Sequence, residues 1–170
     1  MSNSSIHASA HDAAYTAVAA LSNMHLTVAT AESCTGGLVA KLITDVSGSS
    51  AVFECGIASY SDRAKASILG VNPETIEKFG AVSTETAAEM ADGAKRVCSV
   101  DIAVATTGIA GPAGGTPEKP VGTVCIAVAS DRHSEAIRLS FSESMGRDAI
   151  RYASAEAALK LISKTIQFYK

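Results

Sequence analysis

Residues 26–46 read LTVATAESCTGGLVAKLITDV, and this stretch decides how the rest of the chain is interpreted. Its first part, LTVATA at 26–31, is typical of a short buried strand. Its last part, LVAKLITDV at 38–46, puts five apolar side chains on one helical face: Leu38, Val39, Leu42, Ile43 and Val46. Between them lies ESCTGG at 32–37. The stretch therefore predicts a strand, a glycine-containing loop and a helix.

Strands and helices alternate through the rest of the chain. We expect further strands over 52–60, 101–106, 123–130 and 134–141, and helices over 11–23, 62–69, 73–79, 84–98 and 147–168. The turn at 131–133 is too short for a parallel crossover, so the two strands that it joins should be antiparallel. The pattern predicts an α/β fold, a three-layer α/β/α single domain with a mixed, mainly parallel sheet of about five strands.

Length and composition limit the class of protein. The chain has 170 residues, close to one ordinary domain, with 47% hydrophobic and 18% charged residues, so it can bury a full core. We assign residues 1–10 to a weak N-terminal segment and 11–170 to the domain. The net charge is −3 and the 14 Lys and Arg residues are scattered, which disfavours binding to nucleic acid or to an anionic membrane.

The sequence has no signal peptide pattern and no apolar run of about 18 residues, so a cytoplasmic protein is expected. Its four cysteines are Cys34, Cys55, Cys98 and Cys125, and none of them forms a CxxC pair. This spacing argues against a zinc or thioredoxin-like site. We expect four reduced, buried thiols.

Two glycine-bearing loops follow predicted parallel strands, and ligands of such folds bind outside the carboxyl ends of those strands. One is ESCTGG, and the other is TGIAGPAGGTPEKPVG at 107–122, which is long for a compact domain. The first ends at a helix N-terminus, where N–H groups and the helix dipole favour an anion or oxyanion. Neither loop is a Walker A or GxGxxG sequence.

The ESCTGG loop offers two nucleophiles and one structural alternative. Ser33 could attack a substrate, and so could Cys34, because a helix N-terminus lowers the pKa of a thiol. Alternatively, Ser33 or Thr35 caps the helix, and Cys34 is inert packing. Spacing alone does not choose among these interpretations.

A serine nucleophile needs a base, and the four histidines lie in weakly predicted segments or turns, so a Ser-His-Asp triad is disfavoured. A lysine can serve once its surroundings favour the neutral amine. Lys65 and Lys41 are the candidates, and Tyr60 and Asp62 lie close to Lys65 in sequence. The alternative is that each is a solvated surface lysine. Arg147 and Arg151 could clamp a phosphate.

Three segments resemble the C-terminal domain of the CinA competence/damage-inducible family. They are 27–65 (TVATAESCTGGLVAKLITDVSGSSAVFECGIASYSDRAK), GAVS at 80–83 and TTGIAGPAGGTPEKPVGTV at 106–124. The resemblance runs from about residue 10 to the C-terminus. Members of this family include nicotinamide-nucleotide amidohydrolases, also called NMN deamidases. Larger members carry a further N-terminal domain, and this chain resembles the stand-alone form.

The resemblance implies hydrolysis of the carboxamide of nicotinamide mononucleotide in pyridine-nucleotide salvage, with no cofactor and no metal. The implied catalytic residues are Ser33, Lys65 and Tyr60, with Lys65 taking the Ser33 proton directly or through Tyr60. The expected substrate-binding residues are Thr35, Gly36, Gly37, Thr107, Gly108, Gly111, Gly114, Gly115 and Arg147. Backbone N–H groups of one loop would hold the oxyanion and those of the other the phosphate, in an order that the sequence leaves open.

Two alternatives stay open. The chain could be a non-catalytic nucleotide-binding or interaction module of a competence or damage response, or it could hydrolyse a different amide. The expected partner is a small-molecule nucleotide, and composition is compatible with a homo-oligomer without fixing a subunit number.

Overall fold

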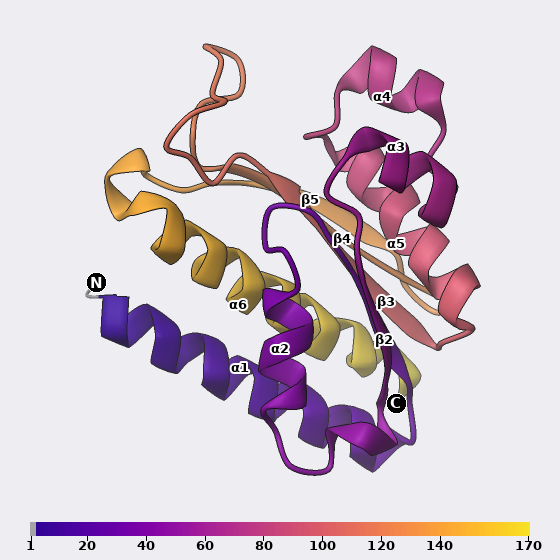
Figure 1. The fold of residues 1–170 in the computed structure, drawn as a ribbon. Helices are drawn as coiled ribbons and strands as arrows, with labels where there is room; N and C mark the ends of the chain where they lie inside the picture. The colour runs from indigo at the N-terminus through magenta and orange to yellow at the C-terminus, as the bar shows by residue number, and fades with distance from the viewer. Residues whose placement is uncertain (1–2) are drawn as a thin grey trace.

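Five strands form one mixed sheet in the order β2-β1-β3-β4-β5 (Figure 1). The computed structural model describes residues 3–170. The strands are β1 Val28–Glu32, β2 Phe53–Ala58, β3 Ile102–Gly108, β4 Thr123–Ser130 and β5 Glu135–Ser140. β1 pairs in parallel with β2 and β3, whereas β3–β4 and β4–β5 are antiparallel. The predicted mixed sheet of five strands and its antiparallel last pair are confirmed.

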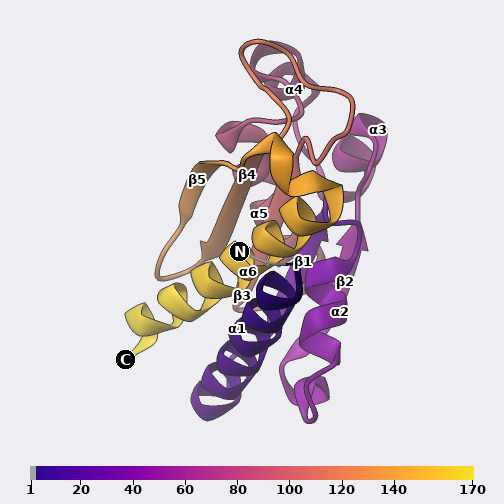
Figure 2. The same ribbon diagram turned by 90° about the vertical axis from the view of Figure 1, so that its left-hand side faces the viewer.

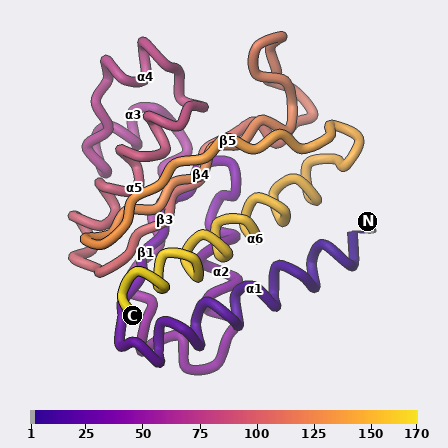
Figure 3. Tube along the Cα trace, turned by 180° about the vertical axis from the view of Figure 1, so that it is seen from behind, coloured from indigo at the N-terminus to yellow at the C-terminus, as the bar shows by residue number. Residues whose placement is uncertain are grey.

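Helices cover both faces of the sheet, which confirms the three-layer arrangement. In Figures 1 and 2, one side carries α1 Asn3–Met24, α2 Leu38–Thr44 and α6 Gly146–Ile166. The other side carries α3 Asp62–Ala64, α4 Pro73–Phe79 and α5 Thr84–Cys98. Each face has its own cluster of buried apolar residues. The view from behind shows α1 and α6 running side by side (Figure 3).

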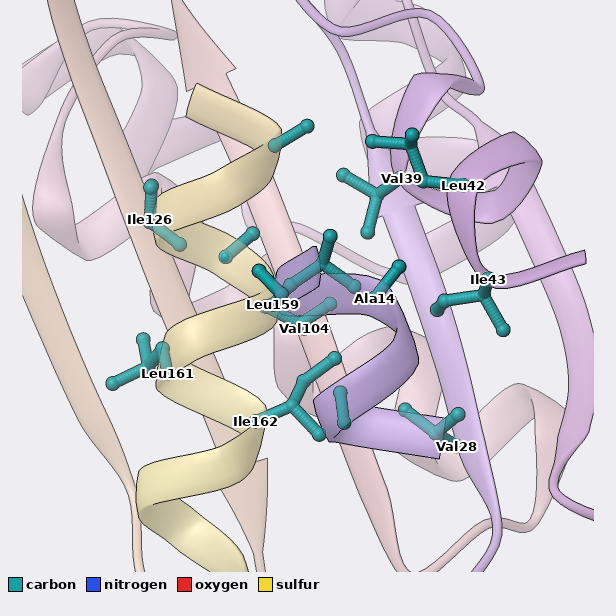
Figure 4. Packing of buried hydrophobic residues seen from close by; sticks show 14 of the residues in the cluster. Ala14, Val28, Val39, Leu42, Ile43, Val104, Ile126, Leu159, Leu161 and Ile162 are labelled. Carbon is teal, nitrogen blue, oxygen red and sulfur yellow. The ribbon is translucent and has the colours of Figure 1, made fainter. Parts of the chain in front are cut away.

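The core is built from small and branched aliphatic side chains, in keeping with an aromatic content of only 5%. On the α1–α2–α6 side, Val28, Val104 and Ile126 of the strands pack against Leu159 and Ile162 of α6 (Figure 4). α1 contributes three fully buried alanines to this interface, Ala10, Ala14 and Ala17, together with Val18 and Leu21. Because alanine has a short side chain, α1 can pack closely against its neighbours.

The first helix begins earlier than expected. It begins at Asn3, so the prediction of a weak segment before about residue 11 is wrong for residues 3–10, while residues 1–2 lie outside the described part. Ile6 and Ala10 are buried and extend the apolar stripe of α1 at helical spacing. The ring of His7 stacks on Tyr152 of α6. These contacts between distant segments stabilise a polar stretch that has little helical signal of its own.

Two cysteines are paired, which corrects the expectation of four reduced, buried thiols. Cys55 of β2 and Cys98, the last residue of α5, form a disulfide with a Cα–Cα distance of 6.5 Å. They are 43 residues apart in sequence. Their proximity depends on how α5 packs across the sheet, which spacing in the sequence does not reveal. Cys34 and Cys125 are free and buried, as expected.

The three parallel strands end at one edge of the sheet, and this edge positions the candidate site. Glu32, Ala58 and Gly108 are the last residues of β1, β2 and β3. The segments that follow them are the ESCTGG turn, the loop into α3 and the long loop at 109–122. Over residues 3–170, no helix is long and apolar enough to cross a membrane.

Candidate active site

Ser33 is held by main-chain hydrogen bonds at the end of β1. Its N–H donates to the carbonyl of Thr106 in β3, at an N–O distance of 2.9 Å. On the other side, the N–H of Ser59 donates to the carbonyl of Glu32 at 2.9 Å. The parallel ladder therefore continues past the strand ends and fixes the position of Ser33, whose side chain is almost buried.

Lys65 reaches Ser33 from the segment that follows β2. The hydroxyl of Ser61 accepts a hydrogen bond from the N–H of Ala64 and starts α3, which continues into a π-helical turn at Lys65–Leu69. Lys65 is only 1% exposed, and its Nζ lies 3.3 Å from Ser33 Oγ. Nζ also lies 3.3 Å from the carbonyl oxygen of Tyr60 and 3.5 Å from Asp62 Oδ1. The predicted hydroxyl and amine thus lie in direct contact.

Cys34 faces away from this contact, into the apolar cluster between the sheet and α2. Burial raises the pKa of its thiol to about 12, so the thiol stays protonated at neutral pH. A protonated, buried thiol is a poor nucleophile. The geometry therefore separates the two candidates that spacing left open, and it favours Ser33.

The anion at the N-terminus of α2 comes from the protein itself. The buried carboxylate of Glu32 accepts hydrogen bonds from the N–H groups of Gly37, Val39 and Ala40 at 2.9–3.0 Å, and from the hydroxyl of Thr30 at 3.1 Å. Neither Ser33 nor Thr35 caps the helix. The expectation that this helix N-terminus holds a substrate anion, with Gly37 as a donor, is therefore wrong.

The rest of the ESCTGG turn is held rigidly. The hydroxyls of Thr35 and Thr106 share a hydrogen bond of 2.6 Å, so the Thr35 hydroxyl is not free to bind a substrate. Arg151 of α6 donates from Nη2 to the carbonyl of Thr35 at 2.6 Å. Gly36 is exposed and has a φ of 60°, a left-handed conformation that favours glycine. Among residues 3–170, no oxygen acceptor is bonded to the N–H of Cys34 or Thr35, and both N–H groups interact with the Cys34 sulfur.

Tyr60 and Arg147 connect the segment after β2 to the long loop at 109–122. The Tyr60 ring is 62% exposed, and its hydroxyl lies 3.3 Å from Arg147 Nη2. Arg147 Nη1 donates to the carbonyl of Gly111 at 2.7 Å. The predicted residues Tyr60, Gly111 and Arg147 thus meet at one place. Tyr60 touches Lys65 through its carbonyl and not through its hydroxyl.

Other predicted residues have structural contacts instead. Thr107 donates its hydroxyl to the carbonyl of Ala81 at 2.7 Å. At Gly108, a Cβ would lie 2.7 Å from Val124 Cγ2, so glycine allows β3 and β4 to pack closely. Gly114 and Gly115 lie in the long loop that projects beyond the sheet (Figure 1, orange). The alternative base, Lys41, is exposed and pairs with Asp45.

A cavity of about 500 Å³ lies elsewhere, between α1, β5 and α6. Apolar side chains such as Leu139, Phe141 and Met145 line it, and neither Ser33 nor Lys65 does.

Sequence reasoning missed two residues of the site, Glu32 and Ser59, and the structural contact that Arg151 makes with the turn. For Glu32, the available signal was an acidic side chain a few residues before a helix that lacks a conventional cap. Arg151 was identified as a possible phosphate ligand, but its contact with the turn depends on how α6 packs. Nothing in the sequence pattern distinguishes Ser59 from other buried serines.

The fold and the site together define the class of protein: a small α/β domain with a serine and a buried lysine in contact at the carboxyl edge of its parallel strands. The chain belongs to the CinA C-terminal domain family, which matches residues 10–166.

Its relatives support this assignment. A competence-damage inducible protein of Acetivibrio thermocellus is 47% identical over 156 residues, which cover 92% of this chain and 37% of that relative. A CinA-like protein of Shewanella baltica is 45% identical over 148 residues, covering 86% of this chain and 34% of that relative. This chain therefore spans about a third of the length of the curated relatives it matches.

Solved structures show the same fold. The crystal structure of competence/damage inducible protein CihA from Agrobacterium tumefaciens matches with a TM-score of 0.89 and 40% identity, covering 95% of this chain and 96% of that one. A competence damage-inducible protein A from Klebsiella pneumoniae matches with a TM-score of 0.89 and 30% identity, covering 95% of this chain and 99% of that one.

Proposed function

We propose that this protein hydrolyses the carboxamide of nicotinamide mononucleotide to nicotinate mononucleotide and ammonia, with Ser33 as nucleophile and Lys65 as general base. The observation that carries the proposal is the contact of 3.3 Å between Lys65 Nζ and Ser33 Oγ. A general base must lie within hydrogen-bond reach of the proton that it takes, or close to it in an unliganded protein. The resemblance to NMN deamidases supplies the substrate.

The reaction begins when neutral Lys65 takes the Ser33 proton as Oγ attacks the carboxamide carbon. The C–N bond then breaks, and the Lys65 ammonium gives its proton to the departing nitrogen, which leaves as ammonia. Water attacks the resulting ester and gives one proton to Lys65. Lys65 returns that proton to Ser33 Oγ as the ester bond breaks, and the acid product loses its remaining proton to solvent and leaves as the carboxylate. Because the Tyr60 hydroxyl lies against Arg147, we propose direct transfer to Lys65 without a tyrosine relay.

The N–H groups of Cys34 and Thr35 are the proposed oxyanion donors. The other N–H groups of the turn have acceptors: Ser33 N–H bonds Thr106, Gly36 N–H bonds Ser33, and Gly37 N–H bonds Glu32. A donor of this kind contributes about 3 kcal/mol when it is preorganised. Glu32 and Arg151 supply that preorganisation by holding the turn from both ends.

Arg147 is the proposed ligand of the nucleotide phosphate. Its side chain is exposed, and its two bonds to neutral oxygens of Tyr60 and Gly111 leave the positive charge without an acidic partner among residues 3–170. A guanidinium held in this way can bind phosphate oxygens in a bidentate manner. The exposed ring of Tyr60 offers a surface on which the pyridine ring can stack.

The experiment is ammonia release from nicotinamide mononucleotide by the wild type, Ser33→Ala, Lys65→Met and the double variant. If the two residues act as one unit, each single variant loses at least about a thousandfold in kcat, and the double variant is no worse than either. Lys41→Met, which removes an exposed lysine, serves as the matched control and keeps wild-type activity.

Several outcomes contradict the proposal. Full activity in Ser33→Ala excludes the nucleophile, and additive losses in the double variant exclude a shared function. Binding of the mononucleotide without turnover supports a binding module instead, and faster ammonia release from another amide changes the substrate.

A further inference from the structure

Ser59 carries a buried hydroxyl that neither the fold nor the proposed mechanism uses. The residue is 0% exposed, and its Oγ bonds no group among the described residues. Nearly all buried polar groups in folded proteins are hydrogen-bonded, because leaving one unpaired is costly. An unpaired buried hydroxyl beside the proposed catalytic pair is therefore a candidate for a role in the reaction.

The main chain places Ser59 beside Ser33 and directly before Tyr60, the residue whose carbonyl bonds Lys65. Its N–H donates to the carbonyl of Glu32, which extends the β1–β2 ladder one step beyond the pair Glu32 and Ala58. Ser59 thus lies opposite Ser33, and paired residues of a parallel ladder project from the same face of the sheet. The next residue along the chain, Tyr60, provides the carbonyl that accepts from Lys65 Nζ.

During the proposed reaction Lys65 gains one N–H donor, which needs an acceptor such as the Ser59 hydroxyl. In the proposed mechanism, neutral Lys65 has two N–H donors, which the Tyr60 carbonyl and Asp62 can accept, and one lone pair, which takes the proton of Ser33 Oγ at 3.3 Å. After proton transfer, the ammonium has a third N–H. Its nearest oxygen is then Ser33 Oγ, which is bonded to the carbon of the tetrahedral intermediate and is a weak acceptor.

We infer that Ser59 is a positioning residue for this reaction: its Oγ accepts the third N–H of the Lys65 ammonium while the tetrahedral intermediate is present. The hydroxyl holds the proton near the departing nitrogen until ammonia leaves, and Lys65 then returns to its bond with Ser33. The inference rests on the proposed roles of Ser33 and Lys65. It assigns an acceptor for the charged intermediate, and it explains why an unpaired hydroxyl is kept in the core.

The test compares Ser59→Ala with Thr123→Val. Thr123 is the matched control because its hydroxyl is also buried without a partner, on β4. Ser59→Ala should lower kcat for ammonia release at least about tenfold with KM little changed, because the hydroxyl acts on the intermediate and not on substrate binding. Thr123→Val should keep both constants. Both variants should unfold at a temperature no lower than the wild type, because each loses an unpaired polar group.

A second readout separates this inference from the identity of the substrate. A fluorophosphonate reacts with an activated serine: Ser33 Oγ bonds to phosphorus, fluoride leaves, and the serine proton passes to Lys65. Its labelling of Ser33 should be slower in Ser59→Ala than in the wild type even if nicotinamide mononucleotide is not the substrate.

Labelling and kcat at wild-type levels in Ser59→Ala overturn the inference. A lower unfolding temperature in Ser59→Ala also overturns it, since the hydroxyl would then support the fold. Wild-type protein that is labelled but releases no ammonia refutes only the proposed substrate. Wild-type protein that is not labelled refutes both.

Discussion

The carboxylate of Glu32 determines the shape of the turn that carries Ser33. A helix N-terminus presents unpaired N–H groups and a partial positive charge, and these attract the nearest anion. Here that anion is one residue before Ser33 in the chain, and it bonds three N–H groups of α2. The turn is therefore organised before any ligand arrives, and substrate anions must bind elsewhere.

Replacing Glu32 by Gln should destabilise the fold and reduce activity. The variant keeps the volume but turns one acceptor into an NH₂ group that faces N–H donors, so the free energy of unfolding should fall by about 2–3 kcal/mol. Urea denaturation measures this loss. Thr30→Val removes only one hydrogen bond to the same carboxylate and should cost about 1 kcal/mol. Equal stability of Glu32→Gln and the wild type would contradict this account of the turn.

Cys34 should make the fold sensitive to alkaline pH. Its pKa is raised from 9.0 to about 12 in the fold, mainly by burial, so the folded state favours the protonated thiol. The stabilisation that this gives is complete below pH 9 and is lost as the pH rises from 9 towards 12. From about pH 8 to about pH 10, wild type should lose about 1 kcal/mol more than Cys34→Ala.

Urea denaturation at the two pH values measures this difference. Cys125 is present in both proteins, so its contribution cancels when the two are compared. Parallel pH profiles for wild type and Cys34→Ala would show that the thiol ionises freely in the fold, which would reopen its candidacy as nucleophile.

The sequence predicted which residues lie at the site better than it predicted what each residue does there. Ser33, Lys65, Tyr60, Gly111 and Arg147 meet where the carboxyl ends of the parallel strands predicted a site. The hydroxyls of Thr35 and Thr107 instead bond other parts of the fold, because threonines near strand ends bond whatever oxygen the packing brings close. Such partners come from segments far away in the chain, so local pattern could not identify them.

The packing of α5 against the π-helical turn sets the position of Lys65. At Gly93 of α5, a Cβ would lie 2.0 Å from the carbonyl oxygen of Leu69, which ends that turn. Arg96 of α5 bonds the same carbonyl at 2.9 Å. Glycine is therefore required where α5 meets the segment that carries the proposed base.

Gly93→Ala should push this turn away from α5 and displace Lys65 from Ser33. We expect a loss of about 1–3 kcal/mol in the free energy of unfolding, together with a clear fall in kcat. Denaturation and ammonia release measure the two effects. Asp92→Ala, at an exposed neighbouring position of the same helix, should change neither. Wild-type activity in Gly93→Ala would show that this packing does not position the lysine.

The first residue of a helix could be predicted from the sequence where a capping residue precedes the helix. Asn72 with Pro73, and Ser83 before Thr84, begin α4 and α5 as their residue types predict. The early start of α1 and the π-helical turn after Ala64 could not be predicted, because both depend on packing against distant helices.

The disulfide joins two parts of the molecule that the sequence keeps apart. It closes a loop of 43 residues between β2 and α5, which includes α3, α4 and the proposed base. By the chain-entropy estimate, such a crosslink contributes about 4 kcal/mol to stability. No pattern in the sequence indicated this pairing, since a contact between a strand and the end of a helix has no spacing rule.

Adding a reductant should therefore lower the denaturant midpoint of the wild type to that of the Cys55→Ala, Cys98→Ala double variant. The double variant itself should not respond to reductant. Thiol titration of unfolded, unreduced protein should find the two free cysteines, Cys34 and Cys125, and not four. Four titratable thiols without reductant would show that the crosslink is absent.

The contact between Ser33 and Lys65 serves the proposed reaction only if Ser33 becomes acylated. Rapid acid quenching of wild-type protein in excess nicotinamide mononucleotide, followed by peptide mass spectrometry, tests this most directly. If Ser33 is the nucleophile, the peptide with Ser33 gains the mass of the substrate minus ammonia, Cys34→Ala keeps this adduct, and Ser33→Ala loses it together with turnover. An adduct on Cys34, or turnover that continues in Ser33→Ala, would show that Ser33 is not the nucleophile.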